Sequence, residues 1–408
     1  MSGMPIPPHA DRFGAAARGG WALEPGSIYL NHGTVGAPPR GVLAAQQAIR
    51  DQIEAHPSRF LLRELSAIRV GGKVRPVPRM REAAAEVAPF VGAEAQDFVF
   101  VDNATTGANA VLRSLRFEPG DEIVVADVAY GAVARTAVFV ARQSGAQVKT
   151  FELPWPPRAE AIVDAFEAAL SPRTRLVIAD HITSESALIL PLAQIAARCR
   201  ARGVPVLADG AHAPGAIPLD VPALGVDWYT ANLHKWAWTP RSCGFLWARR
   251  DRQPDLHPVV ISWGLDQGFT TEFDLVGTRD PSPWLAAPAA IALMREKGEQ
   301  AVRAYNHALA WEGGRHLAAR WDTAIEVAET MIGTMCTVPL PEAMGDDRAS
   351  ADRLRDALLF EDRIEVQVHP WRGRLWIRIS GQIYNQVNEI ERLAEAVLAR
   401  AGGLSSRS

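Results

Sequence analysis

The sequence lacks the features that mark disulfide-rich, metal-binding and membrane-spanning proteins. Its 408 residues include three cysteines, Cys199, Cys243 and Cys336, too few for a disulfide framework. None of them has the spacing of metal ligands, so no metal site is predicted. No apolar run reaches the roughly 18 residues that a membrane span needs. The first 20 residues contain no apolar segment of the secretory kind, and together these absences predict a cytoplasmic location.

A strong excess of either charge is also missing. The 43 basic and 46 acidic residues give a net charge of −3, and the basic residues are scattered along the chain. This gives no electrostatic basis for binding nucleic acid or an anionic membrane. Apolar residues make up 48% and charged residues 22%, the ordinary balance of globular domains. The length suggests two or three domains.

Short β-branched runs alternate with Ala-rich stretches of helical period between residues 97 and 250. Apolar strands that alternate with helices are typical of a mainly parallel sheet covered on both faces. We therefore predict an α/β fold whose ligands bind beyond the carboxyl ends of the strands. The seven predicted strands are residues 98–101, 122–125, 147–151, 176–179, 205–208, 226–229 and 244–247.

The pattern changes after Pro283. A long helical stretch is predicted from residue 284 to about 320, followed by short strands at 335–339, 365–369 and 375–379 and helices at 349–359 and 386–401. We expect three parts: an N-terminal arm over residues 1–40, a large α/β domain over 41–283 and a small α+β domain over 284–408.

A cluster of small and hydroxyl residues, Asn103-Ala-Thr-Thr106, follows the first predicted strand and opens a helix. Unpaired backbone N–H groups and the helix dipole make such a helix start an anion site. The alternative is a threonine N-cap without any ligand.

Two further strand ends carry ionisable residues. Asp209 ends one strand, where it could cap the next helix, orient His212 or meet a cationic ring nitrogen. Lys235 follows the strand at 226–229 among apolar and aromatic residues. A desolvated lysine amine is nucleophilic toward an aldehyde, although a lysine near a strand end can also extend its ammonium into solvent.

Together, the helix start, the strand-end aspartate and the lysine follow one another in an order that resembles the pyridoxal-phosphate enzymes of fold type I. The resemblance runs from residue 29 to residue 380 and is to the class V aminotransferase family, in particular its isopenicillin N epimerase-like members. It is carried by the motifs at residues 31–36, 103–106, 209–212, 234–236 and 277–281. It implies a large domain with a mostly parallel seven-stranded sheet and a smaller α+β C-terminal domain.

The resemblance assigns the chemistry of pyridoxal 5′-phosphate to four residues. Lys235 would hold the cofactor as a Schiff base and act as the base at Cα. Asp209 would keep the ring nitrogen protonated, because an opposite charge favours the charged form. Tyr130 would stack on the ring, and His212 would hydrogen-bond its edge.

The phosphate group of the cofactor has its own set of implied contacts. Ala104 and Thr105 would bind it through the helix start, and Asn232 and His234 would add contacts from the lysine loop. Asn232 stands where many relatives carry Ser or Thr. Thr278 would reach the phosphate of the neighbouring subunit, which implies a homodimer.

The resemblance also implies contacts with the phenolic oxygen and with the substrate. Ser184, or its neighbour Thr183, would contact the phenolic oxygen of the ring. Arg378 would bind the α-carboxylate of an amino-acid substrate by a bidentate pair, and a surface arginine is the alternative. Asn31 and His32 are candidates for the substrate pocket, and His32 could equally be a packing histidine.

The resemblance implies chemistry at Cα of a small-molecule amino-acid substrate, and the leading hypothesis is an amino-acid epimerase. The alternatives are a C–S β-lyase similar to hercynylcysteine sulfoxide lyases, an aminotransferase, and a non-catalytic protein built on the fold. Retention of Lys235 and Asp209 argues against the last. Persulfide chemistry is disfavoured, because residues 366–374, which precede Arg378, contain no cysteine.

Overall fold

The computed structural model describes residues 4–68 and 75–405, which form two compact units. We call Arg40–Ser184 with Leu190–Leu293 the large unit, and Met1–Pro39 with Glu185–Ile189 and Met294–Ser408 the small unit. The first 39 residues therefore fold with the C-terminal part of the chain, and β1 (Ile28–Tyr29) pairs in parallel with β10 (Ile364–Glu365).

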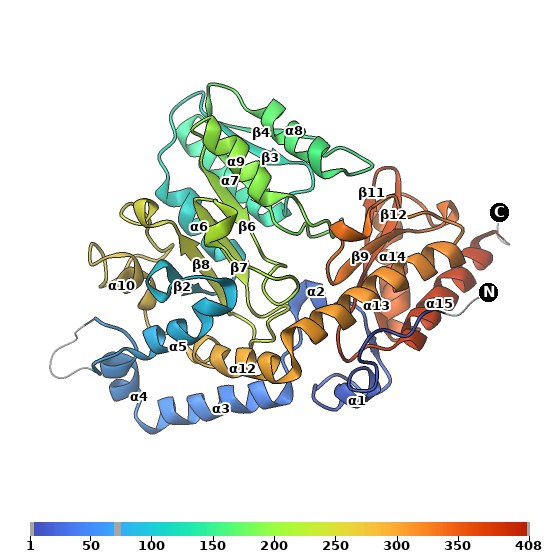
Figure 1. The fold of residues 1–408 in the computed structure, drawn as a ribbon, viewed down its shortest axis with the longest axis horizontal. Helices are drawn as coiled ribbons and strands as arrows, with labels where there is room; N and C mark the ends of the chain where they lie inside the picture. Colours follow the sequence, from blue (N-terminus) through green and yellow to red (C-terminus); the bar gives the residue numbers. More distant parts are fainter. Residues whose placement is uncertain (1–3, 69–74, 406–408) are drawn as a thin grey trace. The chain divides into compact units, whose positions relative to one another are not determined.

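The large unit is built on a seven-stranded sheet in the order β2-β8-β7-β6-β5-β3-β4. Only β8 is antiparallel to its neighbours among these seven strands (Figure 1). This confirms the predicted α/β fold and its mostly parallel sheet. The strands are β2 (Phe98–Val101), β3 (Glu122–Ala126), β4 (Gln147–Phe151), β5 (Thr174–Asp180), β6 (Val206–Asp209), β7 (Trp228–Asn232) and β8 (Gly244–Ala248).

Helices connect these strands and contact the sheet. α6 packs against α7, and α8 packs against α9, and each pair contacts strands of the sheet. The α-helices of this unit are α3 (Arg40–Ala55), α4 (Pro57–Arg59), α5 (Arg79–Val87), α6 (Ala104–Ser114), α7 (Gly131–Ser144), α8 (Ala159–Ala169), α9 (Leu192–Ala201), α10 (Phe269–Asp274) and α11 (Ser282–Leu285). Short helices of other types are η1 (Phe60–Glu64), η2 (Ala88–Val91), η3 (Ala95–Asp97), η4 (Pro222–Leu224) and η5 (Arg250–Arg252).

The carboxyl ends of β2, β3, β5, β6 and β7 meet at one edge of the sheet because these strands are parallel. α6 lies close to β7 at this edge. A Cβ atom on Gly107 of α6 would lie 2.0 Å from Oγ1 of Thr230 in β7, so only glycine allows the helix to approach the strand this closely.

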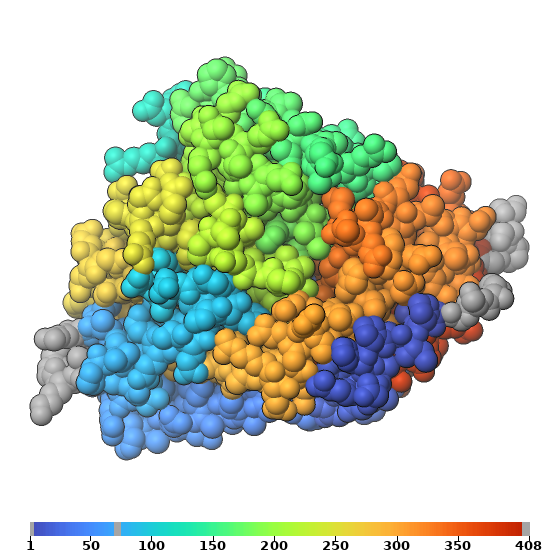
Figure 2. Space-filling model, in the orientation of Figure 1, coloured from blue at the N-terminus to red at the C-terminus, as the bar shows by residue number. Residues whose placement is uncertain are grey.

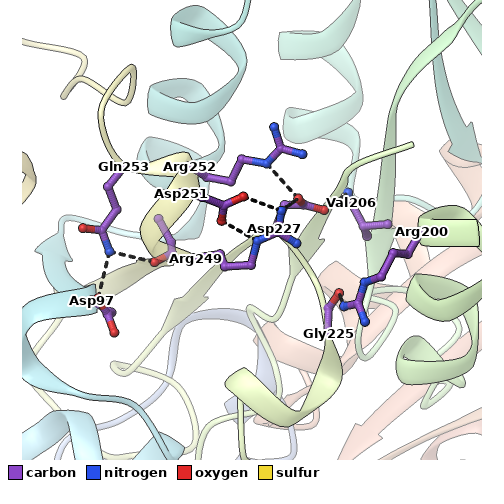
Figure 3. A network of polar contacts seen from close by, with 10 residues as sticks. Asp97, Arg200, Val206, Gly225, Asp227, Arg249, Asp251, Arg252 and Gln253 are labelled. Carbon is purple, nitrogen blue, oxygen red and sulfur yellow. Dashed lines mark hydrogen bonds and ion pairs between the residues drawn. The ribbon is translucent and has the colours of Figure 1, made fainter. Parts of the chain in front are cut away.

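The opposite end of β7 is held by a polar network around the buried Asp227 (Figure 3). Oδ2 of Asp227 accepts the Val206 N–H at 2.9 Å, which ties β7 to β6. Oδ1 lies 2.9 Å from Nε of Arg252 and 3.1 Å from Nη2 of Arg249. These contacts satisfy the buried carboxylate and fix the register of the central strands.

The small unit contains an antiparallel sheet in the order β11-β12-β9. α13 contacts β9 and α15, and α14 contacts β11. Its strands are β9 (Met335–Pro339), β11 (Gln367–Trp371) and β12 (Arg374–Ser380). Its helices are α1 (Ala15–Arg18), α2 (His32–Val35), α13 (Glu299–Arg320), α14 (Arg348–Phe360), α15 (Val387–Ser405), η6 (Glu329–Met331) and η7 (Glu342–Met344).

The helical stretch predicted from residue 284 to about 320 consists of three helices. The chain forms α11, α12 (Ala287–Lys297) and α13. Pro288 lacks a backbone N–H and therefore suits the first turn of α12 rather than the interior of a longer helix. Gly298 has a φ of 86°, which ends α12 before α13 begins.

The described residues contain neither a membrane-spanning helix nor a metal-binding cluster. No helix within residues 4–68 and 75–405 combines the length and apolar character needed to cross a membrane. Within the same ranges, no three His, Cys, Asp or Glu side chains are grouped so that they could bind a metal ion.

Candidate active site

Lys235 lies in the turn between β7 and β8 in the large unit. The backbone N–H groups of Leu233 and His234 both donate to the Cys243 carbonyl, which closes this turn. Lys235 is 8% exposed, and its Nζ atom lies 3.1 Å from Nε2 of His212. The amine is therefore held inside the protein, and the alternative of a lysine extending into solvent does not apply.

Asp209 ends β6 and is almost completely buried. Residues 210–216 contain no helix, so Asp209 does not cap one. Its Oδ1 atom accepts the Ala211 N–H at 2.9 Å. Burial raises the pKa of Asp209, while the Ala211 N–H and the charge of Lys235 act in the opposite direction.

The second carboxylate oxygen of Asp209 fits the predicted cofactor. Oδ2 is buried and has no hydrogen-bond partner among the described residues. A buried acceptor without a partner costs about 1–3 kcal/mol. A ligand that donates a hydrogen bond to Oδ2 would remove this cost. The protonated ring nitrogen of pyridoxal phosphate is a cationic donor of the required kind.

The start of α6 is the predicted phosphate site. Asn103 is the N-cap residue, and its Oδ1 accepts the Thr106 N–H at 2.9 Å, so the cap is not the threonine that the alternative interpretation required. The Ala104 N–H donates to Oδ1 of Asn232 at 2.8 Å. Asn232 thus joins the end of β7 to the start of α6. Its amide hydrogens and the Thr105 N–H remain candidate donors to a phosphate.

His234 makes a more restricted contribution than the sequence predicts. Its Nδ1 atom lies 3.0 Å from the Cys243 carbonyl oxygen. Burial lowers the pKa of His234 to about 4, so the imidazole is neutral at pH 7. Because the carbonyl takes the hydrogen on Nδ1, the neutral ring has none on Nε2 to donate. Donation to a phosphate would require protonation of the ring.

The other predicted cofactor residues lie elsewhere in the large unit. Tyr130 precedes α7 and is 42% exposed, and its backbone N–H interacts with the carboxyl group of Asp180. Thr183 is fully buried, whereas Ser184 is half-buried. Thr278 is exposed and follows Gly277, whose φ is 108°. An exposed position is compatible with the predicted contact to a neighbouring subunit.

The predicted substrate residues lie together in the small unit. Arg378 of β12 is 3% exposed, and burial lowers its pKa to about 10, so it is charged at pH 7. Its Nη2 atom lies 2.8 Å from Oγ1 of Thr34 and 3.5 Å from Oδ1 of Asn31. The alternative of a surface arginine is therefore wrong. Nδ1 of the buried His32 lies 2.8 Å from the Tyr384 hydroxyl.

Three polar residues near the predicted cofactor and substrate residues were not predicted from the sequence. Thr34 orients Arg378, and its signal is the position three residues after Asn31 at the start of α2. Asp180 ends β5 just as Asp209 ends β6. His181 follows Asp180, and Nδ1 of His181 lies 2.8 Å from the Tyr229 hydroxyl. An ionisable pair at a strand end was the available signal for both.

The fold and the residues gathered in the large unit define a pyridoxal-phosphate-dependent enzyme of fold type I. The sequence matches the family described as Aminotransferase class-V over residues 73–393, and the chain belongs to this family. The predicted family, enzyme class and cofactor are confirmed.

Two curated relatives cover most of the chain. Isopenicillin N epimerase of Streptomyces clavuligerus is 34% identical over 405 residues, which cover 95% of this chain and 98% of the relative. The probable chloroplastic L-cysteine desulfhydrase of Arabidopsis thaliana is 31% identical over 404 residues, which cover 92% and 83%.

Solved structures share the fold at lower identity. The apo cysteine desulfurase of Thermococcus onnurineus NA1 has a TM-score of 0.77 at 17% identity, covering 99% of this chain and 100% of that chain. A C-DES mutant with glycine covalently linked to its PLP cofactor has a TM-score of 0.74 at 22% identity, covering 94% and 98%.

Proposed function

We propose that this enzyme is an amino-acid epimerase, which removes the proton at Cα of an amino acid and returns it from the other side. The observation that carries the proposal is the buried Lys235 amine, which is suited to proton transfer at Cα. The epimerase relatives support it, because they match this chain over 98% and 97% of their own length.

Each of the predicted site residues in the large unit has a defined role in this proposal. Pyridoxal phosphate, when bound, withdraws electrons from the amino acid attached to it and so weakens the Cα–H bond. Asp209 holds the proton on the ring nitrogen through its second oxygen. The α6 start and Asn232 fix the phosphate, and Lys235 moves the proton at Cα. Fixing the phosphate and the ring orients the bond that breaks.

Epimerisation requires a second acid on the face opposite Lys235. His212 and Tyr130 are the two candidates in the large unit. Because His212 contacts Lys235 directly, we assign it to the same proton-transfer pair. We therefore propose Tyr130 as the second acid, since its side chain is 42% exposed and can meet a ligand.

A C–S β-lyase is the second candidate, and the contact between Lys235 and His212 favours it. Two adjacent proton-transfer groups can remove the Cα proton and protonate a sulfur leaving group at Cβ. Curated relatives of this chain include several named cysteine desulfhydrases. Persulfide formation on the protein is disfavoured, since Cys336 is fully buried and burial raises the pKa of its thiol to about 12.

We also propose that the active enzyme is a homodimer. Residues 259–265 hold five exposed apolar side chains, 42–78% exposed, in the yellow part of the surface in Figure 2. These are Val259, Val260, Ile261, Trp263 and Leu265. A contiguous exposed apolar stretch of this kind marks an interaction surface. Light scattering should give a dimer, and Ile261→Glu with Trp263→Glu should give a monomer of reduced activity; a wild-type monomer of full activity would refute this.

The decisive experiment incubates the holoenzyme in heavy water with L-amino acids and S-substituted cysteines. Deuterium at Cα with loss of chirality supports the epimerase. A 2-oxo acid with ammonia supports the lyase and overturns the epimerase. Conversion of the cofactor to its amine form indicates aminotransfer and overturns both.

A further inference from the structure

Two buried carboxyl groups lie side by side at the carboxyl ends of β5 and β6. Asp180 and Asp209 are register partners in these neighbouring parallel strands, so their side chains project to the same face of the sheet. They are 4% and 2% exposed. The pairing of the strands continues beyond them, because the His181 N–H donates to the Asp209 carbonyl at 2.8 Å. Two carboxylates held this way cannot both be ionised without strong repulsion.

The surroundings of the pair decide which member keeps the proton. The Ala211 N–H and the positive charge of Lys235 favour the ionised form of Asp209. Burial and the charge of Asp209 both raise the pKa of Asp180 well above its ordinary value. The other ionisable groups nearby stay neutral: burial lowers the pKa of His181 to about 4 and raises that of Tyr229 well above its usual range.

Asp180 also makes a specific contact with another predicted cofactor residue. Its carboxyl group interacts with the backbone N–H of Tyr130, which directly precedes α7. The carboxyl end of β5 is thereby tied to the start of α7. This contact lowers the pKa of Asp180, but burial and the charge of Asp209 raise it more. A neutral acid still presents its carbonyl oxygen to the N–H group.

We propose that Asp180 is held as a neutral carboxylic acid that fixes the backbone of Tyr130 and leaves Asp209 as the one charged carboxylate at the cofactor's ring nitrogen. Asp180 is then a positioning residue, acting through Tyr130 and Asp209. This inference rests on the proposed roles of Tyr130 and Asp209.

Asparagine mimics a neutral aspartic acid in shape and in its carbonyl acceptor, so Asp180→Asn is the informative variant. It should bind pyridoxal phosphate with a dissociation constant within about two-fold of wild type. Asp180→Ala loses the polar contact to Tyr130 and should bind about ten-fold more weakly. Asp209→Asn, the matched change on the neighbouring strand, should weaken binding more than either.

Infrared spectroscopy of the protein without cofactor tests the protonation state directly. The difference spectrum of wild type minus Asp180→Asn at pH 7 should contain the carbonyl band of a protonated carboxyl group. Asp209→Asn should retain this band. A missing band, or an Asp180→Asn variant as weak in cofactor binding as Asp209→Asn, would overturn the proposal. If the wild type binds no pyridoxal phosphate, the proposed function fails, and the infrared band still reports on Asp180.

Discussion

Nζ of Lys235 lies 3.1 Å from Nε2 of His212, and both side chains are buried in the large unit. At this distance the two groups share one proton: the ammonium donates to a neutral imidazole, or the imidazole donates to a neutral amine. A lysine that must bind an aldehyde needs its amine in the neutral form. His212 can therefore accept the proton that Lys235 gives up, without water entering the site.

Lys235→Ala should abolish the visible absorbance of the holoenzyme while leaving the protein folded. The amine is the covalent attachment point assigned to Lys235, and alanine provides none. Absorbance spectra of protein purified with excess pyridoxal phosphate, with circular dichroism as the measure of folding, test this. Lys149→Ala is the matched control, because Nζ of Lys149 hydrogen-bonds to the Ala169 carbonyl. An unchanged spectrum in Lys235→Ala would refute the assignment.

Asn232→Asp should weaken pyridoxal phosphate binding by about 10²-fold. The new carboxylate can still accept the Ala104 N–H that Oδ1 of Asn232 accepts at 2.8 Å, so the start of α6 stays in place. Its charge, however, would repel the phosphate, and close like charges cost several kcal/mol.

The dissociation constant of the cofactor, measured by absorbance titration, tests this prediction for Asn232. The free energy of unfolding of the cofactor-free protein is the control and should change by less than about 1 kcal/mol, since the cap on α6 is preserved. Equal cofactor affinity in the variant and the wild type would mean that no phosphate binds near Asn232.

Much of the fold could be predicted because its strands are short, apolar and separated by helices. The direction of β8 could not be predicted from the sequence. All five of its residues are buried, and so are all five of β7. A strand buried on both faces has the same hydrophobic pattern whether it runs parallel or antiparallel to its neighbour. The connection of residues 233–243, which allows an antiparallel return, is the only local signal.

The candidate site was predictable where several residues form a motif and not where one polar residue acts through another. Asp209 and Lys235 stand out in the sequence because each ends or follows a buried strand. Asp180 occupies the equivalent place on β5, but only the register of β5 against β6 shows that it adjoins Asp209. Contacts between elements distant in sequence, such as that of Asn232 with Ala104, likewise depend on the folded sheet.

His369→Leu should make the protein relatively more stable than wild type as the pH falls. His369 is fully buried in the small unit, and neither ring nitrogen has a hydrogen-bond partner among the residues described. Burial, with the charges of Arg378 and Arg348, lowers its pKa to about 3 from 6.5. Between these values the unfolded chain takes up a proton that the folded protein excludes, so wild type loses stability on acidification.

Leucine at position 369 does not titrate, so the difference in unfolding free energy between variant and wild type isolates this effect. This difference should be constant above pH 7. As the pH falls from 7 to about 3, it should shift in favour of the variant by up to about 1.4 kcal/mol per pH unit. Denaturant unfolding at pH 7, 6, 5 and 4 measures it, and all other titrating groups cancel in the difference. A difference independent of pH would show that His369 titrates equally in both states.

Arg378→Lys should raise the KM for the amino-acid substrate by about 10²-fold while leaving the absorbance of the bound cofactor unchanged. Thr34 and Asn31 orient the guanidinium, and lysine cannot replace its bidentate pair with a carboxylate. Removing one partner of a buried charge pair costs about 2–5 kcal/mol. Arg374→Lys, the same change on the same strand, is the control, because Nη2 of Arg374 hydrogen-bonds to the Leu340 carbonyl. Steady-state kinetics with unaltered KM in Arg378→Lys would assign the substrate carboxylate to another residue.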